Sequence, residues 1–268
     1  MTDLSQIAPL MSPRHSSARA WRRGLVLPAV LVVLWGIMAR IPSLHGQLLV
    51  PLDQILAAPF VDEAGRQIWH ALTESLARFA VGFLAGTGAG IAFGLLTGAS
   101  ATADRVAGPS FNALRQITLF AWIPLLSAWF GNGEAAKIVY VGLSAFFPAA
   151  LNTHDGVRII PVQYRELAKV MGFSPRQRLL RLLLPGALPS IHLGVQIALI
   201  TAWIGTVGAE YVIGVGGGLG TFIAEARGQF RMDLVLLGVL VLALVGLVIN
   251  AAVEFAFARW RRRQGAVA

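Results

Sequence analysis

The sequence predicts an all-α, polytopic membrane protein with about six membrane-spanning helices. Its 268 residues are 56% hydrophobic and only 13% charged, whereas soluble domains carry about 25% charged residues. The apolar residues gather in runs of about 18 residues or more, long enough to cross a bilayer as helices. One aqueous core cannot bury so much apolar surface, so lipid is the expected solvent.

The N-terminal part of the chain predicts a tail and one separate span. Residues 1–23 are polar and basic and are expected to form a cytoplasmic tail. The first span is expected at 24–42, and because it lacks a small-x-small cleavage site we interpret it as a retained helix. An external loop with one or two short amphipathic helices is expected to follow it, so that 24–75 holds the first span and this loop.

The remaining apolar runs predict a core of five spans over residues 76–258, followed by a basic cytoplasmic tail at 259–268. Three residues, Pro124, Gly131 and Pro148, interrupt the second and third of these spans. The spans are expected at 76–98, 112–131, 136–153, 187–208 and 233–257.

The basic residues predict the orientation. Six spans put both termini on one side, and most of the 22 Lys and Arg residues fall on that side, many of them in the loop 154–185. Because basic loops remain in the cytoplasm, we expect both termini and this loop to be cytoplasmic. The same pattern accounts for the net charge of +9 without nucleic-acid binding.

Several chemistries are excluded by what the sequence lacks. It has no cysteine, its five histidines form no metal-binding pattern, and no G-x-x-x-x-G-K-[ST] phosphate-binding loop occurs. The glycine-rich run 214–220 fails the G-x-G-x-x-G pattern at Leu219 and is expected to be an external loop. We therefore expect no metal, no cofactor and no ATPase site in this chain. Glu134 and Glu210 are expected at solvated external interfaces.

Glycine recurs at every fourth position of the span 76–98, which lays a groove along one helix face. Such a groove allows another helix to approach closely. It is either a mobile interface or tight packing within the bundle. The glycines are Gly82, Gly86, Gly90, Gly94 and Gly98.

The stretch 161–189 predicts two short helices joined by a tight turn. Gly172 suits the C-terminal cap of the first helix, and Ser174 with Gln177 forms a capping box for the second. Pro185 is expected to stop the second helix. Arginines alternate with leucines along it, which is typical of a helix that lies on a membrane surface or docks into a partner.

The same stretch resembles the EAA signature of ABC importer permeases, E-A-A-x3-G-x9-I-x-L-P. Every spacing matches, with leucine in place of the second signature residue and of the isoleucine. The matching residues are Glu166, Ala168, Gly172, Leu184 and Pro185, and the departures are Leu167 and Leu182.

The resemblance extends over about residues 70–260. The stretches 121–158 and 201–227 look like the branch that imports aliphatic sulfonates, taurine, nitrate or related small anions. The resemblance implies a type I ABC importer permease fold in the bacterial inner (plasma) membrane. It also implies a homodimer of this chain, separate ATP-binding cassette ATPase subunits, and a soluble substrate-binding protein outside.

Functional residues follow from the resemblance and from polarity within spans. Glu166, Ala168 and Gly172 are expected in the docking turn of a coupling helix on the ATPase, with Phe173, Arg176 and Pro185 as further members. Polar and aromatic residues within spans either line a pathway or satisfy interhelical contacts. The pathway candidates are Trp122, Trp129, Asn152, Thr201, Trp203 and Thr206.

The main alternative is a secondary, ion-coupled transporter. Such a protein usually needs an internal repeat or acidic residues deep in the membrane, and neither is visible in the sequence. A membrane enzyme or a structural scaffold would not need the coupling signature. The substrate itself is not encoded here, because a binding protein largely selects it.

Overall fold

A computed structural model describes the chain from residue 50 onward almost continuously. The described residues are 26, 30, 33–39, 50–61 and 63–265, with side chains described as far as residue 259. The chain divides into two units, 1–55 and 56–268. In the first unit the indole Nε1 of Trp35 donates to the carbonyl of Val50 at 3.1 Å. The expected tail 1–23 and most of the expected first span lie outside the described residues.

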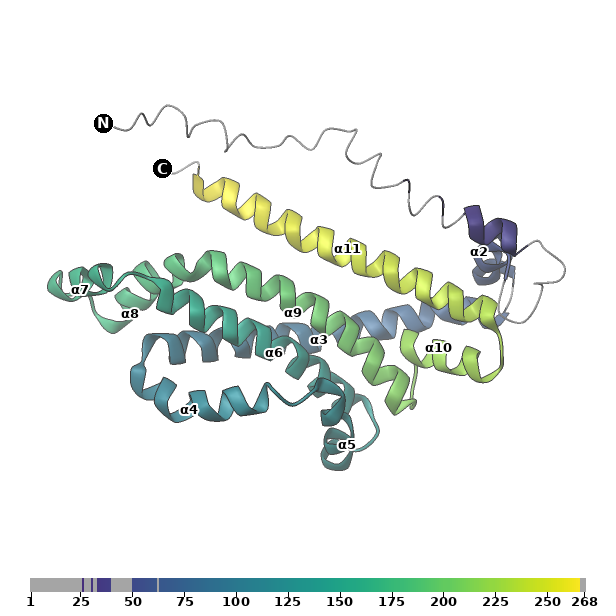
Figure 1. Ribbon diagram of the computed structural model, residues 1–268, viewed down its shortest axis with the longest axis horizontal. Helices are drawn as coiled ribbons and strands as arrows, with labels where there is room; N and C mark the ends of the chain where they lie inside the picture. Colours follow the sequence, from purple (N-terminus) through teal and green to yellow (C-terminus); the bar gives the residue numbers. More distant parts are fainter. Residues whose placement is uncertain (1–25, 27–29, 31–32, 40–49, 62, 266–268) are drawn as a thin grey trace. The chain divides into compact units, whose positions relative to one another are not determined.

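From residue 52 the described chain is helical and contains no strand (Figure 1). Four helices are long and apolar enough to cross a membrane, or up to five if the bent pair α4–α5 counts as one span. The elements are α2 (Leu52–Val61), α3 (Glu63–Ala99), α4 (Ala101–Leu114), α5 (Leu119–Phe130), α6 (Glu134–Ile159), α7 (Val162–Val170), α8 (Pro175–Arg178), a π-helical turn (Leu179–Leu183), α9 (Leu184–Ile213), α10 (Leu219–Gly228) and α11 (Met232–Gly265).

The centre of the second unit is the packing of α6 between α3 and α9. The glycine stripe of α3, Gly82 to Gly98, is buried and faces α6. A Cβ on Gly86 would overlap the carbonyl of Gly142, and one on Gly90 would lie 2.6 Å from the carbonyl oxygen of Phe146. Because the glycines carry no side chains, the two helices approach backbone to backbone. The structure therefore places the stripe in tight packing within one chain.

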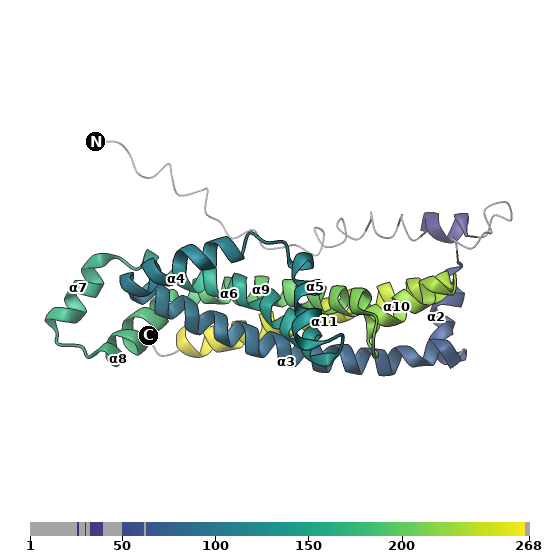
Figure 2. The same ribbon diagram turned by 90° about the horizontal axis from the view of Figure 1, so that it is seen from below.

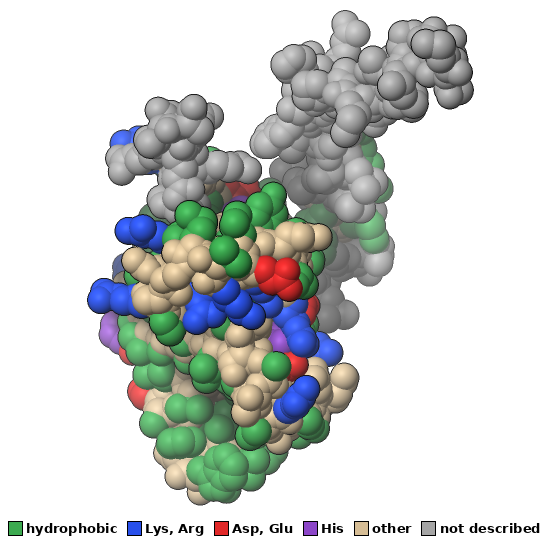
Figure 3. Space-filling model, turned by 90° about the vertical axis from the view of Figure 1, so that its left-hand side faces the viewer, with side chains coloured by type: hydrophobic (Ala, Val, Ile, Leu, Met, Phe, Trp, Pro, Cys, Tyr) green, Lys and Arg blue, Asp and Glu red, His purple; other side chains and the backbone are tan. Residues whose placement is uncertain are grey.

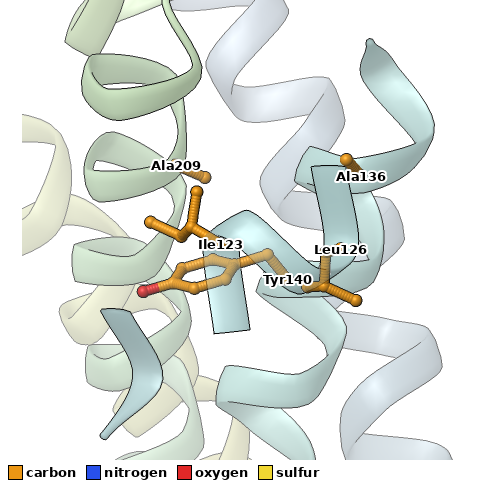
Figure 4. Packing of buried hydrophobic residues seen from close by; sticks show 5 residues of the cluster. All are labelled: Ile123, Leu126, Ala136, Tyr140 and Ala209. Atoms are coloured by element: carbon orange, nitrogen blue, oxygen red, sulfur yellow. The ribbon is translucent and has the colours of Figure 1, made fainter. Parts of the chain in front are cut away.

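A cluster of apolar side chains joins α5, α6 and α9. The ring of Tyr140 on α6 lies beside Ile123 of α5 and close to Ala209 of α9 (Figure 4). Leu126 and Ala136 complete the buried set. This cluster fixes α5 against the two longer helices.

The connections gather at two opposite ends of the second unit. The α3–α4 connection and the elements α7 and α8 lie at one end, whereas the loop before α10 lies toward the other (Figures 1 and 2). Helix α11 runs from the second end back to the first (Figure 1). This alternation is what successive membrane spans require.

The expected span 112–131 is wrong as a single helix. Helix α4 begins at Ala101, where Ser100 caps it by accepting from the N–H of Ala103 at 3.2 Å. The chain breaks after Leu114, and α5 follows at a bend of 99°. The stretch between the expected spans 76–98 and 112–131 is thus helical. Its N-cap is local, and Asp104 in its first turn pairs with Arg158 at 2.9 Å.

Two of the expected interruptions do not end a helix. Pro124 lies inside α5 and Pro148 inside α6, whereas Gly131, at φ +74°, does end α5. Helix α3 also begins earlier than expected, at Glu63, so that part of the expected external loop is helical. These extensions lengthen the bundle without changing the order of its spans.

Candidate functional site

The connection from α6 to α9 folds as an elbow, defined here as residues 162–183. Helix α7 ends in a Schellman motif, in which Phe173 N–H donates to the carbonyl of Ala168 and Gly172 N–H to that of Lys169, both at 3.0 Å. Gly172 adopts φ +71°, as its position after the helix requires. The predicted αL cap at Gly172 is confirmed.

The second arm of the elbow begins with the predicted capping box. Gln177 N–H donates to Ser174 Oγ at 3.3 Å, and Ser174 N–H donates to Gln177 Oε1 at 2.8 Å. These reciprocal bonds satisfy two backbone donors that a helix start leaves free. Both arms of the elbow are therefore held by local hydrogen bonds.

The expectation that Pro185 stops the second arm is wrong. A π-helical turn over 179–183 leads directly into α9, and Pro185 stands in the first turn of that helix. Proline lacks an N–H and crowds the carbonyl four residues earlier, and the wider π turn accommodates this without ending the helix. The helical path is continuous from Pro175 to Ile213.

The predicted coupling residues divide by exposure. Glu166, Gly172 and Arg176 are exposed, Phe173 is half-buried, and Ala168 is 5% exposed. Pro185 is also exposed. Ala168 therefore packs inside the elbow, whereas the other members are available at its surface.

Exposed apolar side chains crowd the tip of α7, a feature that sequence reasoning did not single out. Leu167, Val170 and Met171 are 54%, 85% and 63% exposed. Viewed onto this end of the molecule, Lys and Arg side chains form a band across the face (Figure 3). Apolar groups rimmed by charge are typical of a surface that another protein covers.

The pathway candidates do not surround one cavity in the described chain. Thr201 donates to the carbonyl of Ser144 at 3.0 Å, and Asn152 to that of Pro148 at 2.8 Å. Thr206 is fully buried and donates to the carbonyl of Ala202 at 2.9 Å. These polar groups are satisfied by helix backbones.

The three tryptophans among the candidates lie in different surroundings. Trp203 is 8% exposed, donates to the carbonyl of Leu242 on α11 at 3.3 Å, and meets Phe79 edge-on at 5.6 Å. Trp122 packs against the Tyr140 cluster. Trp129 is 64% exposed. The single chain thus buries Trp203, half-buries Trp122 and leaves Trp129 at its surface.

A buried ionic network, missed from the sequence, joins α3, α6 and α9. Arg78 of α3 forms an ion pair with Glu210 of α9, whose side chain is 0% exposed. Arg78 Nε and Nη2 also donate to the two carboxylate oxygens of Glu134, each at 2.7 Å. Ser75 Oγ donates to Glu210 at 2.8 Å. The expected solvated position of Glu210 is therefore wrong, whereas Glu134 keeps 57% of its side chain exposed.

The same network holds the glycine-rich loop. Gly220 N–H donates to Glu210 at 2.9 Å, and Leu219 N–H donates to Ser75 Oγ at 2.8 Å. Fully buried Lys137 donates to the carbonyl of Val215 and lies 3.7 Å from Glu134. The loop that leads into α10 is thus fixed by charged side chains from three spans.

Glycine is required where this loop passes the network. Gly218 adopts φ +131°, and a Cβ there would overlap the carboxylate of Glu210. Gly214 and Gly216 also have positive φ, at +65° and +79°. A signal for the network did exist in the sequence, namely charged residues at span ends close to a glycine run. Their pairing required the tertiary structure.

Comparisons with known proteins agree with this architecture. Residues 86–264 match the family described as "Binding-protein-dependent transport system inner membrane component". The aliphatic sulfonates transport permease protein SsuC of Bacillus subtilis is 34% identical, over 90% of this chain and 88% of the relative. The nitrate import permease protein NrtB of Leptolyngbya laminosa is 32% identical, over 89% and 88%.

A third relative and a solved structure extend the comparison. The bicarbonate transport system permease protein CmpB of Synechococcus elongatus is 31% identical, over 92% of this chain and 94% of the relative. An inward-facing structure of the MetNI methionine ABC transporter has the same fold, with a TM-score of 0.61 and 23% identity, over 74% of this chain and 97% of that chain. These matches favour an ATP-driven importer over an ion-coupled carrier. The chain belongs to the family of binding-protein-dependent transport system inner-membrane components.

Proposed function

We propose that this permease carries a small anion and that its elbow, residues 162–183, receives the movement of an ATP-binding cassette ATPase on the cytoplasmic side. One observation carries the coupling role. The second arm of the elbow continues without a break into α9. Helix α9 carries Glu210 in its last turn and leads into the glycine-rich loop. A rigid helix passes a displacement at one end to the other, as rigid-body switching requires.

The tip of the elbow supplies the docking surface in this proposal. Exposed Glu166 and Arg176 offer charged contacts, and Val170, at 85% exposure, offers an apolar one. Gly172 leaves open space, since a Cβ there would meet no atom within 4 Å. The ATPase surface approaches closely at that point. Ala168 and Phe173 are less exposed and fix the shape of the turn from inside the elbow.

The substrate class follows from the relatives. Those described above are named for aliphatic sulfonates, nitrate and bicarbonate, which are all small anions. We assign this chain an organic sulfonate such as taurine, or a related anion such as nitrate, delivered by a soluble binding protein on the outer side. Stimulation of the ATPase activity of the reconstituted importer by each candidate, with its binding protein, tests this assignment.

We propose that the pathway lies between two copies of this chain. No one cavity gathers the candidate residues within the described part of a single copy, and Trp129 faces outward. In a two-fold homodimer the same surface patch of both copies forms the interface, so an outward-facing residue in that patch contacts the partner. Trp122, Asn152 and Thr201 are half-buried and remain candidates for the walls of that interface, whereas Trp203 and Thr206 are buried within one copy and would support those walls from behind. Chemical cross-linking of the purified permease, read as a doubled mass, tests the homodimer.

The orientation is tested with single cysteines, because the chain has none of its own. Val170→Cys lies at the elbow and Val212→Cys near the opposite end of α9, and both side chains are exposed. A membrane-impermeant thiol reagent is expected to label Val212→Cys in intact cells and Val170→Cys only in inside-out vesicles. Val170→Cys is also expected to cross-link to the ATPase subunit. Labelling of Val170→Cys from outside contradicts the proposed topology.

A further inference from the structure

A groove of about 820 Å³ lies between the last turns of α3 and the elbow. Its walls are apolar. They come from Ala92, Leu95 and Leu96 on α3, and from Leu179 and Leu182 in the π turn. This volume falls within the range of about 300–1,000 Å³ that is usual for small-molecule sites.

The rim of the groove is basic. Arg165, Lys169 and Arg178 line it together with a single carboxylate, Glu166. Arg165 donates through Nη2 to the carbonyl of Val157. Among the described residues, the Nε atoms of Arg165 and Arg178 are buried and have no hydrogen-bond partner. Buried guanidinium donors without an acceptor are costly, so both arginines keep positive charge at the groove that the chain itself does not neutralise through these atoms.

The combination of apolar walls with a cationic rim selects an amphipathic anion. The walls belong to helix turns at the end of a membrane span, where acyl chains meet headgroups. We propose that the groove binds an anionic phospholipid, with its phosphate at Lys169 and Arg178 and its upper acyl chain along α3. This lipid would belong to the cytoplasmic leaflet, which rests on the orientation given under the proposed function.

The charge of the rim favours an anionic lipid over the N-terminal tail of the same chain as the occupant of the groove. The tail 1–23 carries Arg14, Arg19, Arg22 and Arg23, and like charges at the rim disfavour its entry. The ATPase is assigned to the tip of the elbow, where Val170 and Arg176 are exposed and do not line the groove, whereas Glu166 lies at the edge shared by the two surfaces. A lipid in the groove would brace α3 against the elbow and link coupling to anionic lipid content.

The test uses the complete importer, with its ATPase subunit, in nanodiscs of phosphatidylcholine with or without phosphatidylglycerol. Native mass spectrometry then counts the lipid retained by the released complex. Lys169→Gln and Arg178→Gln are each expected to lower phosphatidylglycerol retention about fivefold, the effect of one basic residue near an anionic surface. Arg181→Gln is the matched control, since Arg181 is exposed on the same arm and does not line the groove.

A second variant separates shape from charge. Ala92→Trp fills the apolar wall from an exposed position and keeps every rim cation, so it is expected to lose phosphatidylglycerol as well. Phosphatidylcholine and soluble glycerol phosphate are expected not to be retained, which distinguishes a lipid from a free phosphate. Equal phosphatidylglycerol retention by wild type and all three groove variants overturns the proposal.

Failure of the lipid proposal is distinguishable from failure of the proposed function. If the ATPase co-purifies with every variant and retention is equal throughout, the groove does not bind lipid and the coupling role stands. If the wild-type chain does not co-purify with an ATPase, the proposed function fails first. Cross-linking of Ala92→Cys, which lines the groove away from the tip of the elbow, to the ATPase or to the N-terminal tail would also overturn the lipid assignment by placing a protein in the groove.

Discussion

The guanidinium of Arg78 on α3 is ion-paired with the carboxylate of Glu210 on α9, and the two side chains are 3% and 0% exposed. Neither charge reaches solvent, so each depends on the other and on nearby hydrogen bonds for the stabilisation that water would have given. Glu210 also accepts from Ser75 and from the N–H of Gly220. This pair therefore ties two spans to the loop before α10.

Removal of one partner should be worse than removal of both. Arg78→Met leaves Glu210 buried without its cation, and we expect it to destabilise the permease by about 3–5 kcal/mol. Arg78→Met/Glu210→Gln is expected to lose less, because a neutral amide still accepts from Gly220. Thermal unfolding in detergent, followed by tryptophan fluorescence, measures both. A double variant that is as unstable as the sum of the single variants would contradict the pairing.

The glycine-rich loop tolerates no side chain where it passes the network. Gly218→Ala meets both a positive φ of +131° and the carboxylate of Glu210, so we expect a loss of about 1–3 kcal/mol from backbone strain alone. Gly228→Ala is the control, because a Cβ there meets no atom within 4 Å. The two melting temperatures should differ clearly, and equal values would show that the loop adjusts without strain.

Close packing of α3 on α6 predicts a face-dependent effect of bulk. Gly90→Leu places a side chain where a Cβ already lies 2.6 Å from the Phe146 carbonyl oxygen, and overpacking costs about 1–3 kcal/mol or more. Gly88→Leu lies on the same helix, where a Cβ meets nothing within 4 Å, and should be tolerated. Membrane yield and thermal stability compare the two. Equal yield and stability of the two variants would contradict the close backbone contact between α3 and α6.

Substitutions at the elbow should uncouple transport without removing the protein from the membrane. Gly172→Asp adds a charge on the open side of the turn, and Glu166→Lys reverses one on the exposed face. Each is expected to reduce uptake at least fivefold, the lower range of typical coupling energies. Gly172→Asn is the matched control, because asparagine tolerates the αL conformation and adds no charge. Uptake assays at equal membrane levels decide, and normal uptake with both charged variants would argue against docking at this turn.

Local interactions explain what was readable from the sequence. The αL glycine at 172 and the Ser174–Gln177 capping box depend on residues three to five positions apart, so their residue types alone predict the elbow. The four-residue glycine repeat of α3 is equally local, because it follows from helix geometry. Long apolar runs with basic loops predict the class of protein. The spacing of the EAA signature indicates its family.

Only the tertiary structure decided how distant residues meet. Arg78 and Glu210 are 132 positions apart, and no local pattern links them, so Glu210 was expected in solvent. The break between α4 and α5 and the continuous helix through Pro185 also depend on packing and on a π turn, which propensity alone does not reveal. The sequence by itself determined most of the long helices and the two caps of the elbow, because these rest on short-range geometry. The tertiary structure decided which buried charges pair and which loop they hold, because that depends on contacts between three spans.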